Sequence, residues 1–227
     1  MITILRQPTV TLLSKPHFTE PEHLKVQWEG QAPDGERLVE YAGRVCYMSQ
    51  ANPAKRTTQQ YIENLMTMGH GSVLEHANYT LLLEGLSRSC THELVRHRAG
   101  FSYSQLSQRY VDEANAAFVM PPTIIGDPVA EANWTVSVEA AQNAYKRHVE
   151  YLRDKLAHIE DSTQRRKMVR EAARSVLPNA TETKIVVTAN VRAWRHFVEM
   201  RGSEHAEAEI RRLTTEYVLP ILVQVAP

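Results

Sequence analysis

Cysteine is scarce in this chain. Only Cys46 and Cys90 are present, and no C-x-x-C spacing occurs. Two cysteines are too few for a disulfide framework of the kind that stabilises small secreted domains. We therefore expect two reduced thiols in a cytoplasmic protein.

Long apolar runs and glycine-rich phosphate loops are also missing. No apolar segment approaches the roughly 20 residues that span a bilayer, and the start MITILRQPTV lacks the pattern of a signal peptide. We expect no membrane contact. Because neither G-x-G-x-x-G nor G-x-x-x-x-G-K-[ST] is present, any bound dinucleotide must be held by side chains.

An excess of charge of either sign is absent too. Lysine plus arginine and aspartate plus glutamate both number 26, so the formal net charge is zero. A general nucleic-acid coat protein is usually strongly basic, and we expect no nucleic-acid partner here. The 227 residues, 43% hydrophobic and 23% charged, have the composition of a soluble globular protein with one large domain or two small ones.

Hydrophobic periodicity and turn residues predict a mixture of helices and strands. The sequence favours a helix start at Ser87 or Ser89, and helix stops at Gly69 and Gly202. Segment 99–111 carries a glycine and several serines, which predicts a loop that runs into a strand. No regular βαβ rhythm is present, so the pattern indicates an α+β fold. The predicted strands are Ile2–Leu13, Asn78–Leu86 and Lys184–Ala189, and the predicted helices are Gly35–Met48, Thr57–Met68, Ser89–His97, Ala130–Ile159, Thr163–Ser175, Asn190–Met200 and Ser203–Val218.

Arginines are unevenly placed along the chain. Cations packed together are costly unless an anion neutralises them, and the planar guanidinium suits phosphates and the carbonyl edges of bases. The group therefore indicates a site for an anionic ligand, with nucleotides as the obvious class. Solvated helix faces with local salt bridges are the alternative, and for any single arginine the more common one. The arginines concerned are Arg96, Arg98, Arg109, Arg174, Arg192, Arg195 and Arg201.

Two features favour the ligand site. The loop after Arg98 is rich in serine and glutamine, with few carboxylates to pair Arg109. On the late helix, Asn190 and Arg201 are eleven residues apart, about three turns, and so should point the same way. An apolar stripe of Val191, Trp194 and Val198 should pack that helix down beside Arg201.

Other chemistries within the same residues are weaker. His92-Glu93 with His97 suggests a zinc site, but these histidines are five apart, which puts them about 140° from each other on a helix. We therefore expect no metal. Cys90 could be a nucleophile, although a lone cysteine beside an apolar strand is usually just buried. Ser107 has no histidine at a suggestive spacing, so general hydrogen bonding is the better interpretation.

Four blocks of the sequence resemble the flavin-dependent thymidylate synthase family and occur in the family's order from about residue 40 to residue 212. They begin with the flavin-contact segment 70–76 and the signature Arg96-His97-Arg98 followed by segment 104–110. The arginine-plus-leucine-proline segment 174–178 and the helix that starts at Asn190-Val191-Arg192 complete them. The spacer Ala99 to Leu106 is one residue longer than the family pattern, so the placement of 99–101 is open.

The resemblance implies roles for individual residues. A homotetramer with active sites shared between subunits is implied as well, each chain being a single compact domain over residues 1–227 with a small, mostly antiparallel sheet. Flavin adenine dinucleotide (FAD) would be held by Ser72, Arg96, His97, Arg98, Gln105, Asn190, Val191, Arg192 and His196. The substrate deoxyuridine monophosphate (dUMP) would be bound by Glu93, Leu94, Val95, Arg96, Gln105, Leu106, Ser107, Gln108, Arg109, Arg174 and Arg201.

The reaction implied is reductive methylation of dUMP to dTMP, with methylenetetrahydrofolate as carbon donor and NADPH as reductant through FAD. Arg201 would be catalytic: it cannot be a base at a pKa above about 12, but it can stabilise negative charge developing on the pyrimidine. Two alternatives differ in class. One is a non-catalytic nucleotide- or RNA-binding protein that uses the same arginines, and the other is a transferase that depends on Cys90.

Overall fold

The computed structural model describes residues 2–227, and their contacts group them into two compact units. The first unit comprises residues 2–9, 83–96 and 104–185, and the second comprises residues 10–82, 97–103 and 186–227. Helices and strands are mixed in the chain, so the predicted α+β class is confirmed. Among residues 2–227, no helix is long and apolar enough to cross a membrane.

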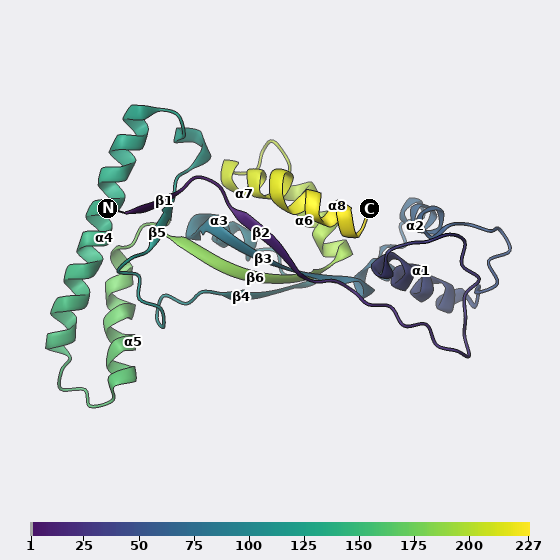
Figure 1. The fold of residues 1–227 in the computed structure, drawn as a ribbon, viewed down its shortest axis with the longest axis horizontal. Helices are drawn as coiled ribbons and strands as arrows, with labels where there is room; N and C mark the ends of the chain where they lie inside the picture. Colours follow the sequence, from purple (N-terminus) through teal and green to yellow (C-terminus); the bar gives the residue numbers. More distant parts are fainter. Residues whose placement is uncertain (1) are drawn as a thin grey trace. The chain divides into compact units, whose positions relative to one another are not determined.

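A helical hairpin dominates the first unit. Helix α4 (Pro128–Lys155) and helix α5 (Ser162–Ala173) lie side by side (Figure 1). Each begins at an aspartate whose carboxylate accepts two main-chain N–H groups of the first turn, Asp127 in α4 and Asp161 in α5. The hairpin encloses a small core of Tyr145, Val149, Val169 and Ala173.

Two short parallel strands and three short helices complete this unit. Strand β1 (Thr3–Leu5) pairs with β5 (Ala117–Val119). Helix α3 (Arg88–Leu94) starts at Ser87, whose hydroxyl accepts from the Cys90 N–H. The 3-10 helices η2 (Pro122–Ile124) and η3 (Arg174–Val176) lie before α4 and directly after α5.

The second unit is mainly helical. Its helices are α1 (Asp34–Tyr47), α2 (Thr58–Thr67), the 3-10 helix η1 (Gly71–His76), α6 (Val191–Arg201), α7 (Ala208–Arg212), the π-helix η4 (Leu213–Val218) and α8 (Leu219–Val225). Figure 1 shows α1 beside α2, and α6, α7 and α8 gathered together.

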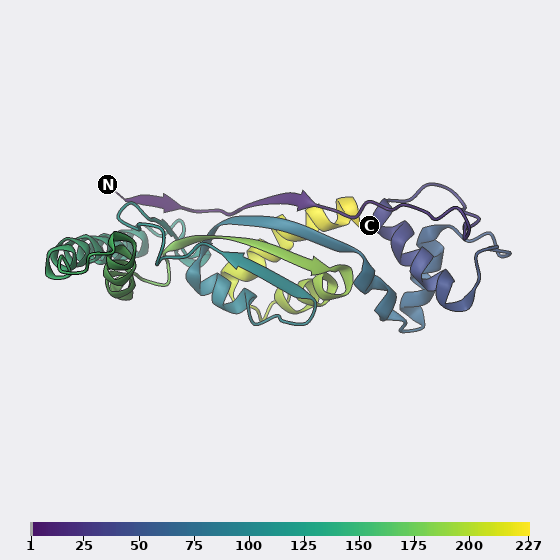
Figure 2. The same cartoon turned by 90° about the horizontal axis from the view of Figure 1, so that it is seen from below.

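A four-stranded sheet has the order β2–β3–β6–β4. Its strands are β2 (Thr9–Ser14), β3 (Asn78–Ser87), β6 (Glu182–Asn190) and β4 (Phe101–Gln105). Thr80 lies beside Thr188, with 2.9 Å between their hydroxyl oxygens, and Glu84 lies beside Lys184 at 2.7 Å. Since partners later in β3 are earlier in β6, the two strands are antiparallel, as predicted for the sheet. Figure 2 shows these long central strands.

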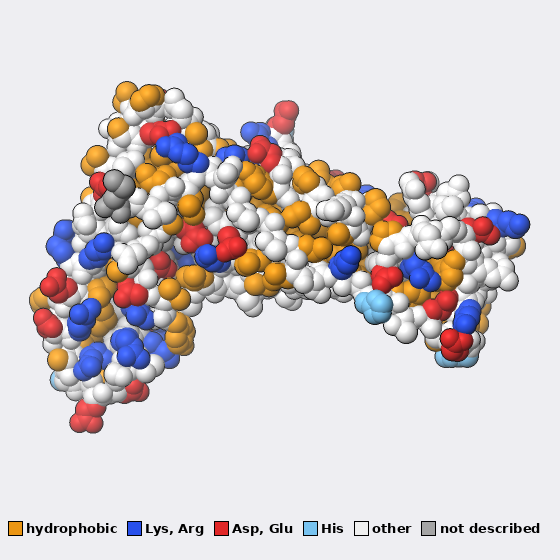
Figure 3. Space-filling model, in the orientation of Figure 1, with side chains coloured by type: hydrophobic (Ala, Val, Ile, Leu, Met, Phe, Trp, Pro, Cys, Tyr) orange, Lys and Arg blue, Asp and Glu red, His pale blue; other side chains and the backbone are white. Residues whose placement is uncertain are grey.

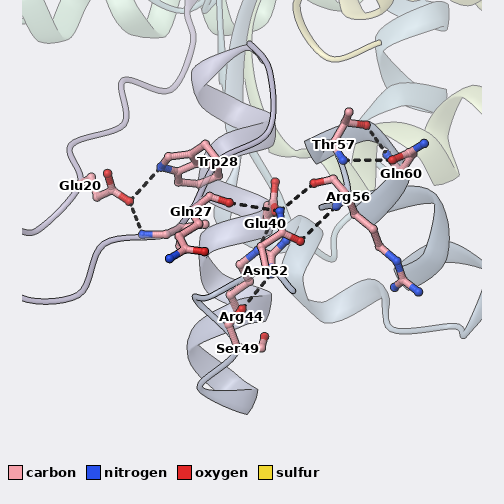
Figure 4. A network of polar contacts seen from close by, with 11 residues as sticks. Glu20, Gln27, Trp28, Glu40, Arg44, Ser49, Asn52, Arg56, Thr57 and Gln60 are labelled. Carbon is pink, nitrogen blue, oxygen red and sulfur yellow. Dashed lines mark hydrogen bonds and ion pairs between the residues drawn. The ribbon is translucent and has the colours of Figure 1, made fainter. Parts of the chain in front are cut away.

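A buried ion pair stabilises α1 (Figure 4). Nε of Arg44 lies 2.6 Å from Oε1 of Glu40, one turn earlier, and the two side chains are only 4% and 1% exposed. Arg44 also donates to the main-chain oxygen of Ser49, and its guanidinium lies 4.6 Å from the ring centroid of Tyr61. The pair therefore connects α1 to the loop that follows it and to α2.

Several predicted boundaries are wrong. Ile2–Leu13 forms two strands, because Pro8 has no N–H to donate to a ladder. The break lies against Gly85, where φ is +68° and a Cβ would stand 3.1 Å from the main-chain oxygen of Gln7. In segment 99–111 a turn at residues 99–100 runs into the strand Phe101–Gln105, as predicted, but the strand ends early and turns follow it.

Helix ends also differ from the prediction. The predicted helix Ser89–His97 is α3, which ends at Leu94, so His92 and His97 do not share a helix. The last predicted helix, Ser203–Val218, begins only at Ala208, because the Glu207 carboxylate caps α7 by accepting from two N–H groups. Asn190 caps α6 in the same way and lies outside it. The eleven-residue alignment of Asn190 with Arg201 on one helix face is therefore wrong.

Candidate functional site

The predicted site residues divide between the two units. Every residue predicted to bind dUMP belongs to the first unit, except Arg201. Every residue predicted to bind FAD belongs to the second unit, except Arg96 and Gln105. The predicted substrate residues and the predicted flavin residues therefore fall mostly in different units.

One cavity of the first unit has a mostly polar lining. Its volume is about 460 Å³, and it contains two guanidinium groups, those of Arg88 and Arg174, against one carboxylate, that of Glu171. This excess of positive charge predicts an anionic ligand. The remaining lining residues are Gln108, Ser175, Leu177, Pro178 and Asn179.

Two donors at this cavity are buried without a partner among residues 2–227. They are Nη1 of Arg88 and Nε2 of Gln108, and Gln108 is only 6% exposed. Leaving a buried donor unsatisfied costs about 1–3 kcal/mol. Such groups require an explanation in a folded protein, and a ligand with acceptor oxygens provides one.

Arg88 is a site residue that the sequence analysis missed. It opens α3 directly after the apolar strand β3, and it lies outside every block that carried the family resemblance. A charged residue at the end of a buried strand was the available signal. Burial lowers the pKa of Arg88, the carboxylate of Glu113 raises it, and the nearby cation Arg174 lowers it to a smaller extent. The guanidinium is therefore partly desolvated and has both an anionic and a cationic neighbour.

Glu113 is the acidic neighbour of this cavity. It is only 5% exposed, and its Oε1 has no hydrogen-bond partner among residues 2–227. Burial raises the pKa of Glu113 to about 7, and the positive charge of Arg88 lowers it in opposition. The carboxyl group therefore gains or loses its proton near neutral pH.

The other predicted substrate residues of this unit have varied surroundings. Nε2 of Gln105 donates to the hydroxyls of Thr91 and Thr183, at 3.0 and 3.3 Å. Leu94 is completely buried, so neither its side chain nor its main chain is accessible to a substrate in this structure. Glu93 lies 3.9 Å from Arg96 in a loose ion pair.

Arg109 has a carboxylate partner, although the loop around it offers few. Its Nε lies 3.0 Å from Oε2 of Glu171. The partner comes from α5, far along the chain, so the local sequence did not reveal it. Both side chains are about half exposed, and an exposed pair of this kind contributes little. Basic side chains gather over α5, which carries Arg165, Arg166, Lys167 and Arg170, and Figure 3 shows their blue atoms.

In the second unit, two predicted flavin segments lie together. Nη1 of Arg192 is 2.6 Å from Oε1 of Glu75, and the Val191 N–H donates to the Ala77 oxygen at 2.9 Å. These contacts join η1, where Ser72 is exposed, to the start of α6. Ser72 and Arg192 are thus on neighbouring, accessible elements.

Three of the predicted catalytic and flavin-binding residues lie close together at the carboxyl end of α6. Nε of Arg201 donates to Nε2 of His97 at 2.8 Å. The His97 ring lies 6.2 Å from the ring of His196 and 5.1 Å from that of Phe197, centroid to centroid. Residues that are about a hundred positions apart in the sequence therefore form one cluster.

The longer spacer is accommodated in an exposed turn. The Phe101 N–H donates to the Arg98 oxygen at 3.1 Å, and Gly100 has φ of +77°. Glycine at this turn position is favoured because it accepts positive φ without strain. A Cβ on Gly100 would also stand 2.6 Å from Nδ2 of Asn190. Residues 99–101, whose placement the sequence left open, therefore form this turn and the first residue of β4.

The second unit also contains an apolar cavity of about 560 Å³. It lies against the other face of α6, where the predicted apolar stripe Val191, Trp194 and Val198 forms part of its wall. Cys90, in the first unit, is completely buried, and an inaccessible thiol cannot attack a substrate. The transferase that depends on Cys90 is therefore excluded.

Known proteins resemble this chain along most of its length. Residues 29–227 match the family model "Thymidylate synthase complementing protein". The flavin-dependent thymidylate synthase of Mycolicibacterium gilvum (strain PYR-GCK) is 53% identical over 220 residues, which cover 96% of this chain and 86% of the relative. That of Mycobacterium sp. (strain KMS) is 51% identical over 224 residues, covering 96% and 87%.

A solved structure has the same fold. The UMP/dUMP methylase PolB from Streptomyces cacaoi, bound with 5-Br UMP, superposes with a TM-score of 0.69 at 22% identity, covering 99% of this chain and 92% of PolB. The family match and the two relatives agree with the order of the four sequence blocks. The chain belongs to the family of the thymidylate synthase complementing proteins, and it is a flavin-dependent thymidylate synthase.

Proposed function

We propose that this protein methylates dUMP to dTMP by binding the nucleotide phosphate in the cationic cavity of the first unit. Methylenetetrahydrofolate is the carbon donor and NADPH the reductant, acting through FAD. The observation that carries the proposal is the pair of unsatisfied donors, Arg88 Nη1 and Gln108 Nε2, at a cavity that Arg174 also lines. A phosphate has acceptor oxygens and negative charge, which match this lining.

The remaining substrate contacts would come from the two segments around this cavity. The end of α3 and the turn after β4 are rich in groups that bind bases and sugars, and Gln108 belongs to the second of them. We assign to the nucleotide, besides Arg88, Gln108 and Arg174, the predicted residues Glu93, Leu94, Val95, Arg96, Gln105, Leu106, Ser107 and Arg109.

The donor set of the second unit fits a dinucleotide. Ser72, Arg192 and His196 are exposed, and the ion pair of Arg192 with Glu75 is exposed as well, so a diphosphate could replace the carboxylate at little cost. When bound, FAD supplies the hydride transfer. The chain's own residues hold and orient it, with Arg96, His97, Arg98, Gln105, Asn190 and Val191 as the further predicted contacts.

Arg201 would act on the pyrimidine. Its guanidinium stays charged at any physiological pH, so it cannot serve as a base. It can instead stabilise the negative charge that develops on the ring as carbon–carbon bond formation begins. A position at the end of α6, half-buried and bonded to His97, suits a group that must keep one direction.

Assembly as a homotetramer with shared active sites, each chain being one domain, belongs to the same proposal. Helix α4 supports it, because Val129, Val136 and Tyr151 are 71%, 67% and 64% exposed, and large exposed apolar side chains are typical of interfaces. Light scattering of the purified protein tests it. A monomeric mass would contradict it. Cytoplasmic location stays a prediction.

The function is tested with Arg201→Ala. We expect that variant to retain bound flavin, seen in its visible spectrum, and to lose dTMP formation by at least about a hundredfold, the usual size of a lost electrostatic contact. Arg195→Ala is the matched control, since Arg195 lies on the same helix at the apolar cavity. Full turnover by Arg201→Ala would show that this role is wrong. A colourless protein that takes up no added flavin would contradict the flavin assignment.

A further inference from the structure

We propose that His97 is a positioning residue for Arg201, through a neutral imidazole that accepts a hydrogen bond from the guanidinium. The inference rests on the proposed function of Arg201, and it gives His97 a second task beside contact with the flavin. The observation behind it is the 2.8 Å bond from Arg201 Nε to His97 Nε2.

The chemistry of this bond determines the state of the histidine. A guanidinium nitrogen can only donate, so Nε2 of His97 must be the unprotonated nitrogen and the ring proton must sit on Nδ1. A bond with a charged donor is about twice as strong as one between neutral groups. Because it is made at Nε, it restricts rotation of the guanidinium plane and hence the direction of both Nη groups of Arg201.

The ring of His97 is itself held firmly. It packs edge-on against Phe197 at 5.1 Å and lies 6.0 Å from the Phe101 ring. The hydroxyl of Tyr103 donates to the His97 main-chain oxygen at 2.7 Å, and the Tyr103 ring stacks on Phe101 with an interplanar angle of 7°. Both the ring and the main chain of His97 are therefore fixed by aromatic neighbours.

The base of this cluster belongs to the helix that carries Arg201. Trp194 and Phe197 are 2% and 0% exposed, and their rings pack edge-on at 5.7 Å. Arg201 follows Phe197 by four residues, one helical turn, so it lies on the same face of α6. The histidine thus joins the signature segment to the last turn of α6 over a rigid aromatic surface.

Removing the acceptor while keeping the aromatic shape tests the inference. His97→Phe should lower kcat by about ten- to a hundredfold, with the KM for dUMP changed less than threefold. His97→Gln, whose Oε1 offers an acceptor at a similar reach, should recover most of the lost kcat. All assays use saturating FAD, and the visible spectrum reports flavin occupancy, so weaker flavin binding is separated from slower chemistry.

A double-mutant cycle with Arg201→Ala makes the test specific. If His97 acts through Arg201, His97→Phe should lower kcat no further in the Arg201→Ala background. Unchanged kcat in His97→Phe, no rescue by His97→Gln, or full additivity with Arg201→Ala would overturn the inference.

The same four proteins are compared by thermal unfolding without flavin, which does not depend on the role of Arg201 in the reaction. The Tm loss of the double variant should be smaller than the sum of the two single losses, because each single variant removes the same bond. If Arg201→Ala proves fully active, the proposed function of Arg201 fails, and the Tm cycle still decides the inference. Additive Tm losses would overturn it, and coupled losses would support it.

Discussion

Each of the two units contains an arginine near a buried glutamate, and the two pairs differ. In the second unit, the buried residues Glu40 and Arg44 are one helical turn apart and bonded at 2.6 Å (Figure 4). In the first unit, the half-buried Arg88 and the buried Glu113 influence each other's pKa, and Arg88 Nη1 and Glu113 Oε1 lack a hydrogen-bond partner among residues 2–227. Arg44 Nη2 and Glu40 Oε2 lack one as well, so the difference is that Arg44 bonds directly to its glutamate whereas Arg88 lines a cavity. One pair is closed, and the other is open to a cavity.

The difference teaches how a fold distinguishes structural from ligand-binding arginines. A closed pair satisfies its own charge, so removing either member leaves an uncompensated charge in the interior. An open pair stores the cost of unsatisfied groups until an anion meets them. We therefore take the arginine that lines a cavity, rather than the one bonded to a carboxylate, as the candidate for ligand binding.

Breaking the closed pair should have the largest effect. Glu40→Ala leaves the buried guanidinium of Arg44 without its carboxylate, and we expect the free energy of unfolding to fall by about 3–5 kcal/mol. Urea denaturation followed by circular dichroism measures this. The double variant Glu40→Met/Arg44→Leu should regain much of the loss. A loss below about 1 kcal/mol in Glu40→Ala would mean that the pair is not a structural one.

Removing the guanidinium of Arg88 should weaken binding of dUMP rather than folding. Arg88→Met removes a charged donor to phosphate, worth about 1.5–3 kcal/mol, which corresponds to a rise in the dissociation constant for dUMP of roughly ten- to 150-fold. Calorimetry should show almost no change for deoxyuridine, which has no phosphate. The urea midpoint should stay the same or rise. An equal loss for the nucleoside would contradict a phosphate contact.

Glu113 should make the free energy of unfolding depend on pH. The pKa of Glu113 is raised by burial from 4.5 to about 7, so the folded state prefers the protonated form. Its contribution is fully present below pH 4.5 and is lost as the pH rises through 7. Glu113→Gln should therefore raise the free energy of unfolding at pH 8 by on the order of 1–2 kcal/mol, since nearby water screens part of the effect. At pH 4.5 the two proteins should be alike, and a gain that is equal at both pH values would exclude this cause.

Breaking the exposed pair of Arg212 and Glu216 should lower the stability least. This pair has the same spacing as Glu40 and Arg44. Arg212 and Glu216 are also four residues apart, at 3.1 Å, but their side chains are 27% and 57% exposed. We expect Glu216→Ala to cost only about 0.3–0.5 kcal/mol. It is the matched control for Glu40→Ala. Similar losses in both variants would show that burial of the charge does not explain the effect of Glu40→Ala.

Local sequence signals predicted the elements better than their partners. The fold class, most helices and the caps at Ser87 and Gly202 follow from periodicity and capping residues, which act over a few positions. The break at Pro8 also had a local signal that the strand prediction overlooked. The pairing of Arg109 with Glu171 and of His97 with Arg201 had none, because both depend on tertiary contacts.

Two residues carried by family blocks line the cationic cavity, and they are Arg174 and Gln108. Arg88, which lies outside the blocks, was missed, although it lines the same cavity and has an unsatisfied buried nitrogen. A single sequence does not tell which of several arginines lacks a carboxylate, since that depends on side chains brought from elsewhere in the fold.

The turn at Gly100 has a consequence for how this signature can be changed by mutation. Ala99 and Gly100 are exposed, but Gly100 has φ of +77°, and a Cβ there would stand 2.6 Å from Nδ2 of Asn190 and 2.9 Å from the Cβ of Ala193. Any other residue at position 100 would be strained and would press on the cap of α6, the helix that ends in Arg201.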